Sequence, residues 1–195
     1  MKKIITIILT LVSLGITAQT SEELEMIKMI NQLRTNPKSF IPYIEERIKG
    51  LETMKANPKF TITLRSNKSN ITEYYIVEYK KLIVFLNKQK PVSVLELSNK
   101  LYLITQNQAN YLDSTKQLTH IGPNGETIGN RMKKMSSTVS ENCAWGSDDV
   151  VETLIVLLLD YGVPNKGHRT NLFNPNMTRV AVAKVNQYWV QDFIK

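Results

Sequence analysis

Apolar residues in the N-terminal part of the chain recur at helical spacing. Thr20 and Glu23 stand three residues apart, as in a capping box, and precede an apolar stripe made of Met26, Ile27, Ile30 and Leu33. This pattern predicts a helix that the dipeptide Asn36-Pro37 interrupts. Both features are local, so the prediction needs no knowledge of the rest of the fold.

The next stretch combines helical and strand patterns. A second helix is expected from Pro37 or Ser39 to Gly50, with an inward face of Phe40, Ile44 and Ile48. The alternation KFTITL at residues 59–64 predicts a short strand, and the RSNKSN that follows predicts a polar turn. Tyrosines and leucines then recur at helical spacing through residues 71–89, which predicts a third helix.

Helices also open the C-terminal half. Ser98 is a good N-cap for a helix that leads to His120, with an apolar face of Leu101, Ile104, Ala109 and Leu112. The GPNG that follows has the composition of a turn, and residues 126–135 predict a short helix. Residues 148–162 are apolar nearly all round between two leading aspartates and Gly162, which predicts a buried helix.

Strand patterns come last in the chain. In the segment VSENCAWG, Glu141 stands between a short extended stretch and a glycine. Residues 179–185 and 188–194 predict two strands joined by a tight turn at Asn186-Gln187. Many helices followed by a few late antiparallel strands predict an α+β fold, with helices packed on a sheet.

The first residues predict export. A basic start at Lys2 and Lys3, an apolar run from Ile4 to Ile16 and a small residue at Ala18 are typical of a secretory signal that is cut after residue 18. We therefore expect residues 1–18 to be a signal peptide and residues 19–195 to form one domain that is secreted or periplasmic. No later apolar run has the length of a membrane span.

Charge and cysteine content narrow the function classes. The formal charge of +8 falls to about +6 when Lys2 and Lys3 leave with the signal. This excess favours anionic surfaces, but the basic residues are scattered and have no aromatic-rich motif beside them, so we expect no nucleic-acid binding. Cys143 is the only cysteine, which excludes an internal disulfide, and a small hydrophobic role suits it better than catalysis.

The chain has only two histidines, and both follow or sit among turn residues. His120 precedes GPNG, and His168 lies in VPNKGHRTNLFNP, whose composition is typical of a loop. Glu141 and Asp160 come from two further segments. Asp160 is out of character near the C-terminal end of a helix, where the dipole disfavours a carboxylate, so another contact must offset that cost. Four separate segments thus supply groups for one site.

Three motifs, in order, carry a family resemblance. LTHIGPNGETIGNRM, SENCAWG and GHRTNLFNPNMTRVAVA resemble the bacterial branch of the CAP superfamily, the SCP-like domain of cysteine-rich secretory and pathogenesis-related proteins. The resemblance runs from about residue 95 to the C-terminus, and MINQLRTNP is similar to the family's first helix. Residues 55–90 match nothing in the family. The resemblance implies a three-layer α-β-α sandwich with a central cleft.

The same resemblance implies the site. His120 and His168 stand at the positions of the two cleft histidines, and Glu141 at that of the family's glutamate. The fourth position is Asp160 or, as the less favoured alternative, Glu152. Two imidazoles with carboxylates form a competent set for Zn²⁺ or another divalent cation, with His120 and His168 as metal ligands.

Three further side chains are expected to support these groups. Asn142 and Asn171 suit the orientation of Glu141 and His168, and Arg169 is expected to pair with a nearby carboxylate rather than to clamp an anion. Trp145 suits the cleft mouth or the core equally well.

Two classes of function follow. The favoured one is a secreted monomer that binds an extracellular ligand, namely a lipid, a glycan or a cell-wall component. The alternative is a metal-assisted or acid/base hydrolase that uses Glu141, His120 and His168. No nucleophile-elbow motif supports the second class. Whether the chain is an enzyme stays open at this level.

Overall fold

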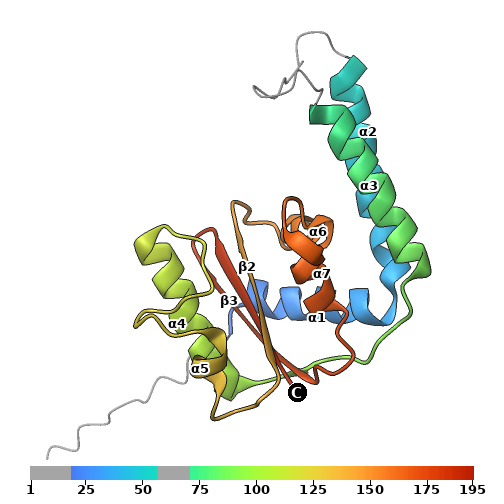
Figure 1. The fold of residues 1–195 in the computed structure, drawn as a ribbon. Coiled ribbons are helices and arrows are strands. Elements are labelled where there is room, and N and C mark those ends of the chain that lie inside the picture. Colours follow the sequence, from blue (N-terminus) through green and yellow to red (C-terminus); the bar gives the residue numbers. More distant parts are fainter. Residues whose placement is uncertain (1–18, 57–70) are drawn as a thin grey trace, which may run out of the picture.

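A computed structural model describes residues 19–56 and 71–195 of the chain (Figure 1). The signal peptide predicted for residues 1–18 lies outside the described residues, and so do the strand and turn predicted for residues 59–70. In the described part, none of the helices combines the length and the hydropathy that crossing a bilayer requires.

The first helix begins as its capping box predicts. Helix α1 (Ser21–Thr35) follows Thr20, whose hydroxyl accepts from the Glu23 backbone N–H at 3.2 Å, while the Glu23 carboxylate accepts from the Thr20 N–H at 2.7 Å. A short 3₁₀ helix, η1 (Pro37–Phe40), then turns the chain into α2 (Ile41–Ala56). Helix α2 continues past Gly50, so the predicted stop is wrong. A single glycine costs a helix interior only about 1 kcal/mol, which the neighbouring turns can absorb.

Helix α3 (Ile71–Lys88) confirms the third predicted helix and packs along α2. Figure 1 shows the two helices as a hairpin that projects away from the sheet, with its base beside α6. This hairpin contains the described part of the segment for which the family resemblance offers no counterpart.

Helix α4 (Asn99–Thr115) starts at the predicted cap, with the Leu101 N–H donating to the Ser98 hydroxyl at 3.3 Å. Helix α5 (Ile128–Met132) is shorter than expected, because it begins only after the Thr127 cap and its following residues form turns. Helix α6 (Val150–Leu159) is capped by Asp149 and ends three residues before Gly162, the predicted stop. Asp160 ends it, since its backbone adopts the left-handed conformation (φ 52°).

The segment around His168 is not the predicted loop. After the 3₁₀ helix η3 (Pro164–Lys166), residues Gly167–Leu172 form the short helix α7. The Asp160 carboxylate accepts from the His168 and Arg169 backbone N–H groups, which supplies the acceptors that the first turn of a helix lacks. A contact from outside the segment therefore stabilises a helix that its composition does not predict.

The sheet has four strands in the order β1-β3-β4-β2. Strands β3 (Arg179–Val185) and β4 (Tyr188–Ile194) form the predicted antiparallel pair, and β2 (Val139–Trp145) pairs antiparallel with β4. The two-residue β1 (Glu96–Leu97), which the sequence analysis did not find, runs parallel to β3. Strand β2 is therefore an edge strand of the sheet.

Helices cover both faces of this sheet. Apolar residues of α1 and α6 pack on one face around Val180, Val182, Trp189 and Phe193. Helices α4 and α5 pack on the other face around Ala181, Ala183, Val190 and Ile194. The alternation of these strand residues follows the two-residue period of a strand. Figure 1 shows the resulting three layers, which confirm the α+β, α-β-α sandwich.

Candidate functional site

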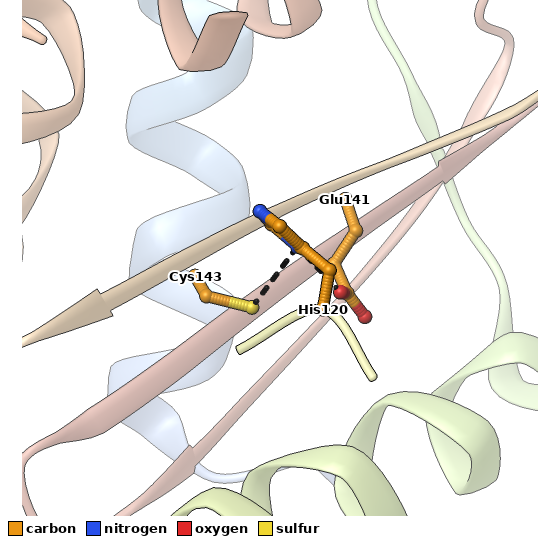
Figure 2. Close-up of side chains that lie close together, drawn as sticks. All are labelled: His120, Glu141 and Cys143. Carbon is orange, nitrogen blue, oxygen red and sulfur yellow. Dashed lines mark hydrogen bonds and ion pairs between the residues drawn. The ribbon is translucent and has the colours of Figure 1, made fainter. Parts of the chain in front are cut away.

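The first histidine pairs with a buried glutamate of the edge strand. His120 lies just beyond α4, and its Nδ1 is 2.8 Å from Oε1 of Glu141 on β2 (Figure 2). The other carboxylate oxygen of Glu141 pairs with Arg131 of α5, which also donates to the His120 carbonyl at 3.0 Å. The His120 side chain is 52% exposed, whereas that of Glu141 is buried. The imidazole is thus held by a buried carboxylate, while much of the ring is open to solvent.

The second histidine pairs with an aspartate at the end of a helix. His168 Nδ1 lies 2.8 Å from Oδ1 of Asp160, and Oδ2 of the same carboxylate accepts from the His168 N–H at 2.9 Å and from the Arg169 N–H at 3.3 Å. The charge of Asp160 faces the N-terminus of α7, where a helix dipole favours an anion. These contacts offset the unfavourable interaction between the Asp160 charge and the helix dipole at the C-terminus of α6.

The two pairs come together at strand β2 from opposite layers of the sandwich. Glu141 and its partner His120 lie on the α4 side of the sheet, while α6 and α7 bring Asp160 and His168 from the other side. The two imidazole centroids are 6.4 Å apart. The edge position of β2 permits this meeting, since no further strand separates the two layers there.

Two asparagines, Asn142 and Asn171, join the layers. Asn171 of α7 donates to the Glu141 backbone carbonyl at 3.2 Å and to the Asn142 side-chain oxygen at 2.9 Å. Asn142 donates in turn to Gln191 of β4 at 3.1 Å and lies 3.4 Å from the His168 carbonyl. The amide groups therefore fix α7, and with it His168, against the edge strand.

The Arg169 side chain has other partners than the carboxylate that was expected for it. Its guanidinium donates to the carbonyls of Leu158 and Leu159 at the end of α6, and lies 4.8 Å above the Phe85 ring. Of the Arg169 groups, the backbone N–H is the one that donates to the Asp160 carboxylate. A cation at a helix C-terminus is favoured by the dipole and by the unpaired carbonyls there.

Glu152, the alternative fourth acid, lies elsewhere. It occupies the first turn of α6 and pairs with Arg47 of α2. The geometry thus gives the acidic position beside His168 to Asp160. Trp145, the last residue of β2, is 60% exposed with its ring centroid 6.4 Å from that of Tyr188, so it does not fill the core.

Two sets of side chains offer atoms that can serve as cation ligands. The first set is the two histidines. Nδ1 of each ring is hydrogen-bonded to a carboxylate, so Nε2 remains as the possible metal ligand, which is typical of metal-binding histidines. In the second, ligand atoms of His120, Glu141 and Cys143 lie within 4.8 Å of one another (Figure 2). The sequence analysis predicted only the first set.

The chemistry of Cys143 weighs against the second set. Burial raises the pKa of its thiol well above the ordinary value, and the charges of Glu141 and Asp192 add to this shift. Metals bind the thiolate, so a raised pKa disfavours both ligation and nucleophilic attack. Cys143 instead packs among the apolar residues between β2 and α4, which agrees with its predicted hydrophobic role.

Asp192 is the main residue that the sequence analysis missed. It lies on β4 directly opposite Glu141 and is fully buried, and neither carboxyl oxygen has a hydrogen-bond partner among the described residues. Burial raises the pKa of this carboxyl well above its ordinary value, and the negative charge of Glu141 adds to the shift. A charged residue within the apolar strand YWVQDFI was the available signal.

Arg131 was also missed as a site residue, although it stands within a quoted motif. Its side chain is 5% exposed and connects Glu141, the His120 carbonyl and the Glu126 carbonyl. Nothing in the spacing of residues 120, 131 and 141 indicates that they meet. Their contact depends on how α5 packs against β2.

Comparisons with known proteins agree with this architecture. The family model of the cysteine-rich secretory protein family, CAP, matches residues 27–193. A search of curated proteins finds no match. One similar solved structure is an extracellular protein with an SCP domain from Bacillus anthracis (19% identity, TM-score 0.48), which covers 67% of this chain and 45% of that chain.

Two further solved structures are similar. An outer surface protein from Borrelia burgdorferi has 19% identity and a TM-score of 0.44, over 62% of this chain and 90% of that chain. A cysteine-rich secretory protein from Staphylococcus aureus has 18% identity and a TM-score of 0.41, over 60% and 37%. The chain thus spans less than half the length of the Bacillus and Staphylococcus structures. Because the family model covers most of its length, the chain belongs to the CAP family of cysteine-rich secretory proteins.

Proposed function

We propose that this CAP protein is an exported binding protein whose two histidines hold a divalent cation, Zn²⁺, as the anchor for an extracellular ligand. The observation that carries the proposal is the matched pair of imidazoles, each fixed through Nδ1 by a buried carboxylate and 6.4 Å apart between centroids. Zinc is commonly held by neutral imidazole nitrogens whose other ring N–H donates to a carboxylate. The ligand would be a lipid, a glycan or a cell-wall component.

The donor set fits such an ion. Nε2 of His120 and of His168 would be its protein ligands, with Glu141 and Asp160 setting the ring orientations. With these two nitrogens as its protein ligands, a zinc ion would supply a Lewis-acidic centre for oxygen atoms of a ligand. His120 is half exposed and His168 is 19% exposed, so a ligand reaches the site from solvent.

The contacts that Glu141 and Asp160 already make favour a binding role over hydrolysis. Glu141 gives one oxygen to His120 and the other to Arg131, while Asp160 gives its oxygens to the His168 ring and to two backbone N–H groups. A general base needs a free oxygen within reach of the proton that it accepts. Neither carboxylate offers one while these contacts persist, so a binding role is the better supported.

Calorimetric titration of Zn²⁺ into the chelator-treated protein tests the proposal. We expect micromolar or tighter binding that weakens at least about 100-fold in a His120→Ala/His168→Ala variant, because both ligands are lost. Circular dichroism would verify that this variant stays folded. A Cys143→Ser variant is the matched control, and its affinity should change less than about threefold. Zinc affinity that survives in the double histidine variant and disappears with Cys143→Ser would contradict the proposal.

A further inference from the structure

A second concave site lies on the outer side of the α4 layer. A groove of about 720 Å³ runs between α4 and the segment 123–134 that contains α5. Its volume is within the range of small-ligand sites, about 300–1,000 Å³. His120 and His168 are not among its lining residues, while Arg131, which pairs with Glu141 of the histidine site, is one of them.

Amide side chains dominate the groove. Five of its lining residues carry a carboxamide: Asn107, Gln108, Asn110, Asn124 and Asn130. The four asparagines are exposed, while Gln108 is fully buried. Gln108 donates to the Thr119 carbonyl at 3.0 Å, but its Oε1 has no hydrogen-bond partner among the described residues. A carboxamide both donates and accepts hydrogen bonds, so such a surface matches ligands rich in hydroxyl or acetamido groups.

The groove also offers one aromatic surface. Tyr111 of α4 is half-buried against the apolar core and lines the groove beside Ile104. A tyrosine ring presents an apolar face with a polar tip, which suits the C–H face of a sugar ring flanked by hydroxyl groups.

Positive charge gathers at one end of the groove. Lys133 and Lys134 are exposed just after α5 and line it, against a single acidic lining residue, Glu126. Neither lysine takes part in an ion pair within residues 19–56 and 71–195. An anionic group on the ligand would satisfy these cations.

We infer that the groove between α4 and α5 binds an acidic oligosaccharide, with its hydroxyl or acetamido groups on the amides and its carboxylate or phosphate on Lys133 and Lys134. The inference goes beyond the proposed cation site, since it needs no metal and neither histidine. It provides a separate contact by which an exported protein attaches to a glycan.

Calorimetric titration with two acidic probes tests the inference and separates the source of the anion. A hyaluronate hexasaccharide carries carboxylates and acetamido groups, and a phosphomannan oligosaccharide carries phosphates. Chitohexaose, which is neutral, and polyglutamate, which is anionic without sugars, are the comparison ligands. All titrations contain a chelator and use the protein and its His120→Ala/His168→Ala variant, so that failure here is independent of failure at the zinc site.

We expect at least one acidic glycan to bind more tightly than chitohexaose and polyglutamate, equally in both proteins. Lys133→Ala/Lys134→Ala should weaken this binding at least about tenfold, and Asn107→Ala/Asn110→Ala, which leaves the charge unchanged, should weaken it several-fold. Lys88→Ala/Lys90→Ala removes two exposed lysines near the end of α3 and should have no effect. An equal loss in this control pair, polyglutamate binding as tight as that of the glycans, or no binding of either acidic glycan would overturn the inference.

Discussion

The two histidine–carboxylate pairs have the same chemistry but different supports. His168 and Asp160 are eight residues apart, and a short connection with several left-handed residues brings them together. His120 and Glu141 are 21 residues apart, and their contact depends on α5 and on the place of β2 in the sheet. The Asp160–His168 pair is therefore local, whereas the Glu141–His120 pair depends on the tertiary fold.

The difference lies in what compensates each buried carboxylate. Asp160 is compensated by backbone N–H groups of α7, which are uncharged but aligned with the helix dipole. Glu141 is compensated by the guanidinium of Arg131, and it also faces the buried Asp192 across the strand pair. We therefore expect the local pair to respond to backbone changes and the long-range pair to respond to charge changes.

Removing the Asp160 carboxylate should have the largest effect. Asp160→Ala deletes the acceptor of three hydrogen bonds and places a side chain without amide or carboxylate in the left-handed conformation, so we expect a loss of about 3 kcal/mol in the free energy of unfolding. Asp160→Asn keeps one acceptor and tolerates that conformation, so it should lose about 1 kcal/mol. Urea denaturation measures both. Equal losses would mean that the carboxylate does not cap α7.

A charge-coupling test should give the next largest effect. Glu141→Gln leaves the Arg131 guanidinium buried without its carboxylate, and we expect a loss of about 2 kcal/mol. Combining it with Arg131→Met should lose less than the sum of the two single losses, with a coupling of about 1–2 kcal/mol in a double-mutant cycle.

The matched cycle at the local pair is Asp160→Asn with Arg169→Met. Because the Arg169 side chain donates to carbonyls rather than to Asp160, these losses should add within about 0.5 kcal/mol. Equal coupling in the two cycles would remove the distinction between the pairs.

The smallest effect should come from replacing Asp192, which lies opposite Glu141 of the long-range pair. Its raised pKa means that the folded state holds a proton that the unfolded chain releases near the ordinary value of about 3.9. Stability should therefore fall as the pH rises from that value toward the raised pKa, because the unfolded state binds fewer protons than the folded state. Asp192→Asn cannot ionise, so its stability relative to the unsubstituted protein should improve as the pH rises from 5 to 7.

Thermal unfolding at several pH values measures this difference. Glu141, Arg131 and Cys143 surround the same region and remain present in both proteins, so their own titrations largely cancel in the comparison. A difference in melting temperature that stays constant across the pH range would show that Asp192 is ionised in both the folded and the unfolded state.

Much of the fold follows from local features of the sequence. The capping box at Thr20, the cap at Ser98 and the strands 179–185 and 188–194 are all as predicted, since each depends on residues within a few positions of one another. The two errors in the helices have different causes. Helix α7 forms because Asp160 caps it, and α2 passes Gly50 because its neighbouring turns tolerate one glycine.

The same division holds for the site. The sequence by itself indicated the two histidines and Glu141, which lie in the quoted motifs, and it favoured Asp160 over Glu152 because Asp160 is nearer to His168 in the chain. Only the tertiary structure brought Arg131 to Glu141, placed Asp192 opposite them and moved Arg169 to the end of α6. The physical reason is register: which residues face each other across paired strands is decided by the whole sheet and its covering helices.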